Sequence, residues 1–362
     1  MSADRMPLAD LADFDEIIDV RSPAEFADDH IPGAINCPVL DDAQRIEVGT
    51  IYKQVSSFEA RKVGAALVSE NIGRHLREHF LTKARDWKPL IYCWRGGNRS
   101  GSLTTVFRTI GWKASQLDGG YKTWRSHVVA QLMRLPQSFN FRVICGATGS
   151  GKTRILQALT ARGEQVLDLE TLASHKGSVL GVLPGQPQPS QKWFETLLLL
   201  ELERFDPARP VFVEAESRKI GRLQVPDALI ERIRAGECLS IDATLAARVT
   251  FLLADYDYFL GMPDLLNERL DILRSLHSAE TMKRWRDMVV AAEWPALVRE
   301  LLEQHYDPLY HRSQARNFSD YGALNDTLPA GDPAIFSTDD LSASGIADIA
   351  ARIIHSRTAQ TA

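Results

Sequence analysis

Short apolar runs alternate with longer stretches of helical character over much of the chain. Runs typical of buried strands occupy residues 17–20, 90–92, 116–117, 141–145, 166–169, 211–213 and 239–241. Helix-like stretches follow two of them, at residues 100–110 and 153–161. Because strands that alternate with helices usually form parallel sheets, the pattern predicts an α/β fold with mostly parallel sheets.

The alternation restarts after residues 134–138, which places a domain boundary near residues 130–140. A length of 362 residues is also typical of two domains. We therefore expect one α/β domain over residues 1–135 and a second over residues 136–362. Within the second, apolar residues at helical spacing predict a largely helical segment at about residues 244–310.

Charge is distributed unevenly, although the whole chain carries a net charge of only −5. Residues 1–50 hold three basic and twelve acidic side chains, whereas residues 51–130 hold fourteen basic and five acidic ones. The weakly acidic total argues against a basic surface over the whole protein, which many nucleic-acid-binding proteins have. The basic block is either an ordinary solvated face or a local phosphate-binding surface.

The four cysteines lack metal-ligand spacing and are too few for a secreted disulfide framework. Three of them, Cys37, Cys145 and Cys238, are expected to be buried, inert thiols. The acidic start of the sequence has no apolar segment typical of a signal peptide. No apolar run reaches the roughly 18 residues that a membrane span requires, so a reducing cytoplasm is the expected location.

Cys93 differs from the other cysteines because it begins a loop rich in glycine and arginine, between a predicted strand and a predicted helix. Successive backbone N–H groups, the helix N-terminus and two guanidinium groups would favour a nucleophilic thiolate there. The same cradle would bind an incoming phosphate, sulfane sulfur or selenium group. We predict Cys93 as the nucleophile, in an anion cradle made by Arg95, Gly96, Gly97, Arg99 and Ser100.

A second anion-binding loop follows the predicted strand at residues 141–145. Residues 146–153 read Gly-Ala-Thr-Gly-Ser-Gly-Lys-Thr and match the P-loop pattern GxxxxGK[ST] in its strand–loop–helix context. Lys152 would reach the terminal phosphates, and Thr153 would hold Mg²⁺ if the ion is used. The predicted phosphate-binding residues are Gly146, Gly149, Ser150, Gly151, Lys152 and Thr153.

A Walker B element would be an apolar strand that ends in an acid, and residues 211–216 fit this pattern with glutamate in place of the commoner aspartate. Glu214, Glu216 and Arg218 are candidates for organising a metal or a proton. A surface acid at a strand end is an alternative of nearly equal weight. Since no base-specificity motif is evident, the P-loop indicates a polyphosphate more firmly than ATP.

Four ordered motifs make residues 15–128 resemble a rhodanese domain. Cys93 and Arg99 have the spacing of that family's active loop. The other motifs are Asp19-Val20-Arg21 with Glu25-Phe26, His30-Ile31-Pro32-Gly33-Ala34-Ile35-Asn36, and Asp118-Gly119-Gly120-Tyr121 with Trp124. Rhodaneses move a chalcogen atom through a persulfide on the loop cysteine, so the resemblance implies that role for Cys93. Trp94 departs from the usual pattern and would narrow the loop or offer a stacking surface.

A rhodanese-like domain followed by a P-loop domain resembles the bacterial tRNA 2-selenouridine synthase family. Residues 48–54, 168–170, 175–178, 181, 214–221 and 306–310 also match, so the resemblance spans about residues 15–312. It implies an enzyme acting on 2-thiouridine at the wobble position of the tRNA anticodon. Geranyl diphosphate would alkylate the sulfur, and selenium from selenophosphate would then replace the S-geranyl group. A selenophosphate-producing enzyme would be a partner, and no membrane is expected.

Binding of tRNA requires phosphate contacts, and the geranyl chain requires an apolar pocket. Within the basic block, the candidates for tRNA contacts are Arg61, Lys62, Arg74 and Arg77. A second group is Lys283, Arg284 and Arg286, beside Trp285, on which a base could stack. The pocket candidates are the aromatic residues Phe251, Tyr256, Tyr258 and Phe259, although such residues are more often simply core.

Two other classes of function fit the same motifs. In one, the P-loop domain transfers or hydrolyses phosphate from ATP while the rhodanese-like domain delivers sulfur, as in a tRNA sulfurtransferase or a kinase-like enzyme. In the other, the chain is a redox or nucleotide sensor in which Cys93 reports oxidation. The complete P-loop and the arginines of the Cys93 loop make the sensor the weakest of the three.

Overall fold

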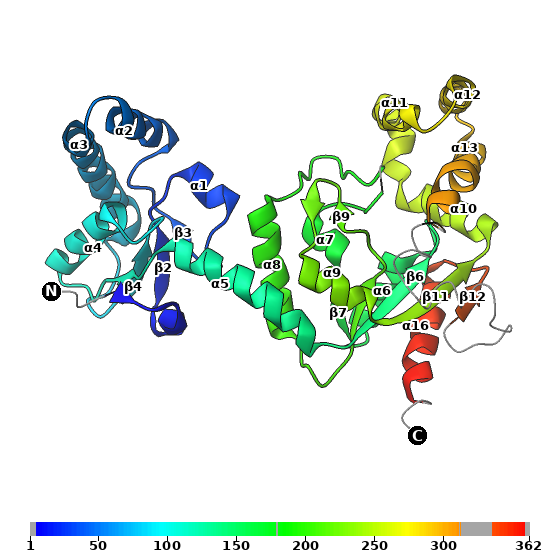
Figure 1. Cartoon of the computed structure of the whole chain (residues 1–362), viewed down its shortest axis with the longest axis horizontal. Helices are drawn as coiled ribbons and strands as arrows, with labels where there is room; N and C mark the ends of the chain where they lie inside the picture. The colour runs from blue at the N-terminus through cyan, green and yellow to red at the C-terminus, as the bar shows by residue number, and fades with distance from the viewer. Residues whose placement is uncertain (1–4, 179, 311, 313–334, 359–362) are drawn as a thin grey trace. The chain divides into compact units, whose positions relative to one another are not determined.

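The computed structural model describes residues 5–178, 180–310, 312 and 335–358 of the chain. The chain divides into two compact units, which Figure 1 shows from blue to red along the sequence. The first unit comprises Met1–Gln131 and Ser190–Thr196, and the second comprises Leu132–Pro189 and Leu197–Ala362. Each unit has its own sheet and core, so each is described by itself.

The first unit is built on a five-stranded sheet in the order β1-β5-β4-β2-β3, and every strand pair in it is parallel. The central strand, Pro89–Tyr92, is apolar and buried at all four positions, as expected for a parallel sheet. The strands are β1 (Arg5–Met6), β2 (Glu16–Asp19), β3 (Ile35–Asn36), β4 (Pro89–Tyr92) and β5 (Ser115–Leu117).

Helices connect these strands, and their boundaries follow local capping signals. Asp41 and Ser56 accept hydrogen bonds from the first turns of the two longest helices before the Cys93 loop. Gly111, in the left-handed conformation, ends the helix after that loop. The helices are η1 (Leu8–Asp13), α1 (Pro23–Asp28), α2 (Asp42–Gln54), α3 (Ser57–His75), the π-helix η2 (Leu76–Phe80), α4 (Asn98–Ile110) and α5 (Tyr121–Arg134).

The second unit has a five-stranded parallel sheet in the order β12-β11-β6-β8-β7. Its central strand leads directly into the P-loop. The strands are β6 (Phe141–Gly146), β7 (Gln165–Leu167), β8 (Val211–Glu214), β11 (Glu237–Ala243) and β12 (Ile335–Thr338). A separate antiparallel hairpin is formed by β9 (Lys219–Ile220) and β10 (Leu223–Gln224).

Helices of the second unit fall into two groups. Those outside the predicted helical segment are η3 (Leu135–Ser138), α6 (Lys152–Thr160), α7 (Leu169–Ala173), α8 (Gln191–Arg204, whose residues up to Thr196 belong to the first unit), α9 (Asp227–Arg234) and α16 (Ala343–Thr358). The others are α10 (Leu245–Asp255), η4 (Asp257–Gly261), α11 (Pro263–Asp271), η5 (Ile272–Ser275), α12 (Ala279–Val290), α13 (Trp294–Leu301) and the π-helix η6 (Leu302–Tyr306). This second group confirms the predicted helical segment, and its core surrounds the fully buried Trp285.

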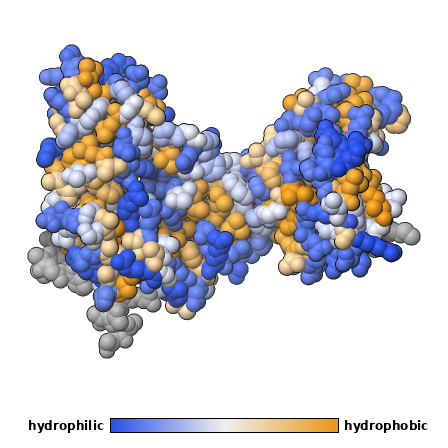
Figure 2. Space-filling model, turned by 180° about the vertical axis from the view of Figure 1, so that it is seen from behind, coloured by the Kyte–Doolittle hydropathy of each residue, from blue (hydrophilic) through white to orange (hydrophobic). Residues whose placement is uncertain are grey.

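The predicted fold class is confirmed, and the differences are local. Asp168 caps α7 instead of extending β7, because its carboxylate accepts from the Thr171 amide at 2.8 Å. On the face shown in Figure 2, hydrophobic patches are interrupted by hydrophilic residues. Among the described residues, no helix combines the length and the apolar character that crossing a membrane would require.

The expectation of inert thiols is wrong for two cysteines. Cys145 on β6 and Cys238 on β11 form a disulfide, with their Cα atoms 6.1 Å apart. The two strands are neighbours in the sheet, and the disulfide crosses them diagonally, because Cys145 pairs with Ser240 and Cys238 pairs with Val143. Cys37 remains a free, buried thiol, and burial raises its pKa to about 12.

Candidate functional sites

Cys93 follows β4 at the carboxyl edge of the first sheet, where parallel sheets commonly place their binding sites. Its side chain is free and buried. The sulfur accepts a hydrogen bond from the Gly97 amide at 3.3 Å and one from the Ser100 hydroxyl at 3.1 Å. The loop therefore presents donors from its own backbone and from the first turn of α4 to the sulfur.

A glycine turn after β5 packs against the Cys93 loop. Gly120 has a φ of +61°, and a Cβ there would lie 2.6 Å from the Gly96 amide nitrogen, so this position requires glycine. The next residue, Tyr121, donates its amide to the Cys93 carbonyl at 2.8 Å. The Asp-Gly-Gly-Tyr motif thus fixes the backbone of the nucleophile loop.

Arg99 lies in the predicted cradle, but it is held by a carboxylate. Its guanidinium forms two hydrogen bonds with Glu25 of α1, one of them 3.2 Å long. Although burial of Glu25 acts in the opposite direction, the Arg99 hydrogen bond and charge keep its pKa below the ordinary value. Arg95 and Trp94 are exposed. Among the described contacts, the donors that touch the sulfur are Gly97 and Ser100, and the expected contact from two guanidinium groups is not observed.

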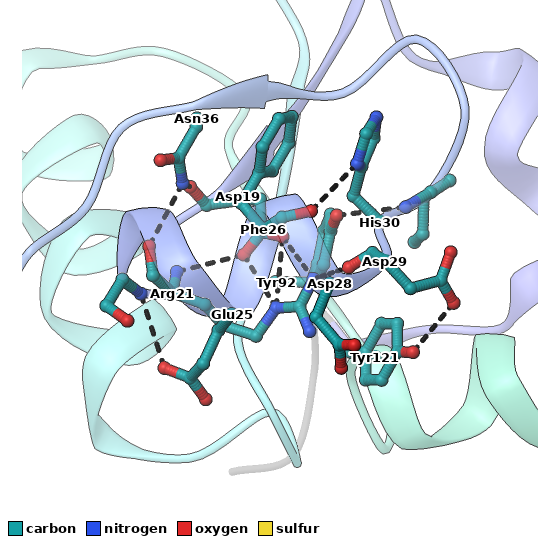
Figure 3. Close-up of polar contacts among 12 residues, drawn as sticks. Asp19, Arg21, Glu25, Phe26, Asp28, Asp29, His30, Asn36, Tyr92 and Tyr121 are labelled. Atoms are coloured by element: carbon teal, nitrogen blue, oxygen red, sulfur yellow. Dashed lines mark hydrogen bonds and ion pairs between the residues drawn. The ribbon is translucent and has the colours of Figure 1, made fainter. Parts of the chain in front are cut away.

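A buried polar network joins Asp19, Arg21, Asp29 and Tyr121, as Figure 3 shows. Arg21 is 1% exposed and bonds the Asp19 carboxylate at 2.6 Å and the Asp29 carbonyl at 2.6 Å. Its guanidinium carbon lies 3.9 Å from the centre of the Tyr121 ring, whose hydroxyl donates to the Asp29 carboxylate at 2.7 Å. Because Tyr121 also bonds the Cys93 backbone, the network connects β2 with the nucleophile loop.

The P-loop lies between β6 and α6, as predicted. Gly146, Gly149 and Gly151 all have positive φ values. A Cβ on Gly149 would lie 2.7 Å from Leu252, so the loop is packed closely against α10. The Lys152 ammonium donates to the Gly146 carbonyl at 3.0 Å, folded back over its own loop. Ser150 Oγ is buried without a hydrogen-bond partner, so the loop retains a free polar group.

Three glutamates meet beside the P-loop. Carboxylate oxygens of Glu170 (α7), Glu214 (the end of β8) and Glu216 lie within 4.8 Å of one another. The Thr153 hydroxyl donates to Glu170 at 3.1 Å. Burial and the neighbouring carboxylates raise the pKa values of Glu170 and Glu214, and burial raises that of Glu216. We call these three residues the carboxylate triad.

Sequence reasoning found two members of the triad and missed Glu170. The stretch Asp168–Glu170 stood out only through family resemblance, and nothing in it indicated proximity to β8. Arg218, predicted with Glu214 and Glu216, is exposed and pairs with Asp227 instead. It therefore does not join the triad.

A pocket of about 550 Å³ lies over the P-loop and the triad. Two contacts tie the end of the helical segment to the P-loop. The Gly146 amide donates to the Tyr310 hydroxyl. Arg248 of α10 bonds the Asp307 carboxylate at 2.6 Å and the Thr148 carbonyl at 2.8 Å. Lining residues also come from the loop after α7 and from α10.

A smaller pocket of about 70 Å³ adjoins the first one and is lined largely by apolar residues. Both pockets share the residues Thr148, Ser178, Leu252, Tyr256 and Tyr306. The rest of the small pocket comprises Leu180, Leu253, Phe259, Leu260, Leu266, Trp294, Leu297, Val298, Leu301 and Leu302. Of the predicted aromatic residues, Tyr256 and Phe259 line this pocket, Phe251 lines the larger one, and Tyr258 lines neither.

The two predicted groups of tRNA contacts differ in structure. The first group, which comprises Arg61, Lys62, Arg74 and Arg77, is exposed on α3 and η2, where Lys62 pairs with Glu59 at 2.8 Å. In the second, carboxylates already pair with all three cations, which are Lys283 (with Asp287), Arg284 (with Glu300) and Arg286 (with Asp271).

The prediction that a base could stack on Trp285 is wrong. This side chain is fully buried in the core of the helical segment. Its indole N–H donates to Glu300 at 3.0 Å. A nucleic acid base therefore has no access to its ring.

Comparison with known proteins agrees with this geometry. Residues 6–127 match the family model described as a rhodanese-like domain, and residues 139–264 match the model of the tRNA 2-selenouridine synthase AAA domain. The fold and the two loops thus define a rhodanese-like domain joined to a P-loop domain in one chain.

Curated relatives identify the family. A tRNA 2-selenouridine synthase of Alcanivorax borkumensis is 32% identical over 81% of this chain and 88% of its own length, and one of Verminephrobacter eiseniae is 36% identical over 81% and 87%. The chain belongs to the tRNA 2-selenouridine synthase family. The match to the Nitrosomonas europaea synthase is 38% identical over 66% of this chain but spans only 63% of that relative.

A solved structure also matches part of the chain. The N-terminal domain of a putative ATP/GTP binding protein from Clostridium difficile 630 is 34% identical, with a TM-score of 0.31. The match covers 34% of this chain and 98% of that one.

Proposed function

We propose that this protein converts 2-thiouridine at the tRNA wobble position to 2-selenouridine in two steps. In the first, the uridine sulfur attacks C1 of geranyl diphosphate, the C–O bond breaks and diphosphate leaves. In the second, selenium from selenophosphate replaces the S-geranyl group, which leaves as geranylthiol, and water hydrolyses the Se–P bond to release phosphate. Because tRNA is the substrate, we place the reaction in the cytoplasm.

The observation that carries the first step is the apolar pocket beside the P-loop. Geranyl diphosphate has an anionic end and an apolar chain, and the two adjoining pockets match these two ends. Backbone N–H groups of the P-loop, the N-terminus of α6 and Lys152 would hold the diphosphate. Tyr256 and Tyr306 lie at the junction, where C1 of the allyl group would sit.

The carboxylate triad fits a magnesium ion. Its donors are carboxylate oxygens beside the Thr153 hydroxyl, which are the hard ligands that Mg²⁺ prefers. One Glu214 oxygen is buried without a hydrogen-bond partner, as expected of a group that a cation would satisfy. A bound ion would neutralise charge on the leaving diphosphate. Glu170, Glu214 and Glu216 would hold it.

The Cys93 loop supports the second step. Its sulfur is a soft nucleophile that receives donors from Gly97 and Ser100, so it is suited to attacking C2 of the S-geranylated uracil ring. The Cys93 sulfur would displace geranylthiol from C2, and selenium of selenophosphate would then displace the Cys93 sulfur. Water would hydrolyse the Se–P bond, so no oxidant is needed. We propose Cys93 as the catalytic residue of selenium transfer.

A second candidate function rests on the same triad. Three carboxylates beside a P-loop threonine also suit Mg²⁺–ATP, so the chain could couple ATP to sulfur delivery from Cys93 to tRNA. The adjoining apolar pocket would then have no use, which is why we place geranyl diphosphate first.

One experiment distinguishes the two functions. Thiolated tRNA is incubated with the protein, geranyl diphosphate and selenophosphate, and its nucleosides are analysed by mass spectrometry. We expect 2-selenouridine from the wild type, S-geranyl-2-thiouridine without selenium from Cys93→Ser, and 2-thiouridine alone from Lys152→Ala. Sulfur delivery to unthiolated tRNA with ATP turnover would support the second candidate instead. Full selenation by Cys93→Ser would exclude the role of Cys93.

A further inference from the structure

Two histidines and a glutamate meet at the end of α3, outside both sites described above. His75 is the last residue of α3, and Glu78 and His79 follow on the π-helix η2. One potential ligand atom of each side chain lies within 4.8 Å of those of the other two. The two imidazole rings are stacked with centroids 5.8 Å apart, so they share one face of the helix. We call these residues the His-Glu-His cluster.

The hydrogen bonding of His75 leaves one nitrogen free. The side chain is 5% exposed, and its Nε2 lies 2.9 Å from the Pro38 carbonyl oxygen. A carbonyl only accepts, so Nε2 carries the proton and Nδ1 keeps a lone pair. Nδ1 is buried and has no hydrogen-bond partner. Histidines that bind metals commonly donate their other N–H to a backbone carbonyl in this way.

The other two side chains are able to complete a ligand set. Helical side chains lean toward the N-terminus, so residues 78 and 79 extend toward His75 on the preceding turn. Their side chains are about half exposed and free to change rotamer, with His79 Nε2 and Glu78 Oε2 3.8 Å apart. Ligand atoms around a tetrahedral zinc ion are about 3.4 Å apart, so only small rotations are required. π-Helical turns also occur frequently at functional sites.

We infer that the His-Glu-His cluster is a binding site for a divalent transition-metal ion, with zinc as the ion that fits best. Two imidazoles and one carboxylate are borderline ligands of the kind that zinc accepts, and a fourth position stays open to water. Since His75 also bonds Pro38, the ion would stabilise the contact between the end of α3 and the segment after β3.

The test is calorimetric titration of the full-length protein with zinc chloride. His79→Ala and Glu78→Gln change exposed side chains, so the fold should survive. His355 is exposed on α16, and His355→Ala is the matched control. We expect His79→Ala to lose one equivalent of bound zinc relative to the wild type, Glu78→Gln to bind that equivalent more weakly, and His355→Ala to match the wild type.

Thermal unfolding gives a second readout, because an ion that binds only the folded state raises the melting temperature. Zinc should raise that of the wild type and of His355→Ala more than that of His79→Ala. Cys93 and the carboxylate triad could also take up zinc, so Cys93→Ser and Glu214→Gln are titrated in parallel. Equal zinc stoichiometry and affinity in wild type and His79→Ala would overturn the inference. So would loss of all zinc binding in Cys93→Ser or Glu214→Gln.

Discussion

The Ser100 hydroxyl lies 3.1 Å from the Cys93 sulfur, and the side chain of Gln116 on β5 orients the hydroxyl proton. The Gln116 amide nitrogen of β5 lies 2.6 Å from Ser100 Oγ. An amide N–H₂ group only donates, so the hydroxyl accepts from Gln116 and turns its own proton away from it. The acceptors that remain are the sulfur and the Gly97 carbonyl, which lies 3.2 Å away.

Replacing Ser100 with alanine should slow the reaction of Cys93 with iodoacetamide at neutral pH. The thiolate loses one donor, and a hydrogen bond contributes about 1 kcal/mol, so we expect a roughly fivefold lower rate. Ser102→Ala, on the same helix, is the control. Because burial raises the pKa of Cys37 to about 12, that thiol should contribute little signal. An unchanged rate in Ser100→Ala would show that the backbone amide alone holds the sulfur.

Lys152→Ala should weaken binding of both geranyl diphosphate and inorganic diphosphate. The ammonium would lose a charge-assisted bond worth about 1.5–3 kcal/mol, or roughly 10- to 100-fold in affinity. Calorimetry with each ligand measures the effect, and Lys113→Ala at an exposed position is the control. Equal affinities in Lys152→Ala and the wild type would place the phosphate site elsewhere.

Filling the small apolar pocket should weaken binding of the geranyl chain without affecting binding of the diphosphate. Val298 lines this pocket from α13, and Val298→Phe would occupy space proposed for the chain. Each methylene that is kept out of the pocket makes the free energy of binding less favourable by about 0.8 kcal/mol. The affinity for geranyl diphosphate should therefore fall roughly tenfold or more. Inorganic diphosphate should bind as before. The control is Val290→Phe, because Val290 is 85% exposed on α12. A parallel loss for both ligands would argue against a separate chain pocket.

The carboxylate triad should make stability depend on pH in the absence of a divalent cation. Glutamates whose pKa is raised hold protons in the folded state after the unfolded chain has released them. Stability should therefore fall as pH rises above about 4.3, the ordinary glutamate value, and through the raised pKa values. A tenfold difference in proton affinity between the folded and unfolded chain corresponds to about 1.4 kcal/mol of stability.

Denaturant unfolding at pH 5 to 8 measures this dependence. Glu214→Gln should flatten the profile, and so should Mg²⁺ added to the wild type. Glu70→Gln, at an exposed position of α3, should leave the profile unchanged. If the wild-type profile is already flat without a divalent cation, the three carboxylates do not share protons in the folded state.

Charge reversal should identify the surface that binds tRNA. Arg74 and Arg77 are exposed, so Arg74→Glu with Arg77→Glu should lower tRNA affinity and reduce the salt slope by about 0.9 for each phosphate that the protein no longer neutralises. Lys283→Glu should have little effect, because Lys283 is already paired with Asp287 at 2.7 Å. Filter binding across salt concentrations, in the presence of a chelator, measures both slopes. A larger loss of tRNA affinity in Lys283→Glu than in the double variant would indicate that tRNA binds at α12 instead.

Local motifs made much of the site predictable, and long-range pairing made the rest hard to predict. Cys93 and Lys152 lie in loops whose glycine spacing is visible in a few consecutive residues. The partner of Arg99 lies 74 positions away, and no pattern in the sequence connects the two. Gln116 likewise carries no signal of its contact with Ser100.

The burial of Trp285 was predictable from the spacing of apolar residues, but the basic residues beside it drew attention away from that spacing. Met282, Trp285 and Val289 are all buried, and their spacing places them on one helical face. The basic residues next to Trp285 suggested a surface, although Lys283 lies on the opposite side of the helix and Arg284 and Arg286 flank the buried face. Periodicity would have placed the tryptophan in the core.

The first P-loop amide, that of Gly146, donates a hydrogen bond to the hydroxyl of Tyr310, which lies 164 positions later in the sequence. Asp307, which holds Arg248 against the same loop, is nearly as distant. The family model of this domain ends at residue 264, so a fragment cut there would keep the P-loop sequence without these two contacts. During synthesis, the loop would therefore acquire its final contacts only after the helical segment has left the ribosome.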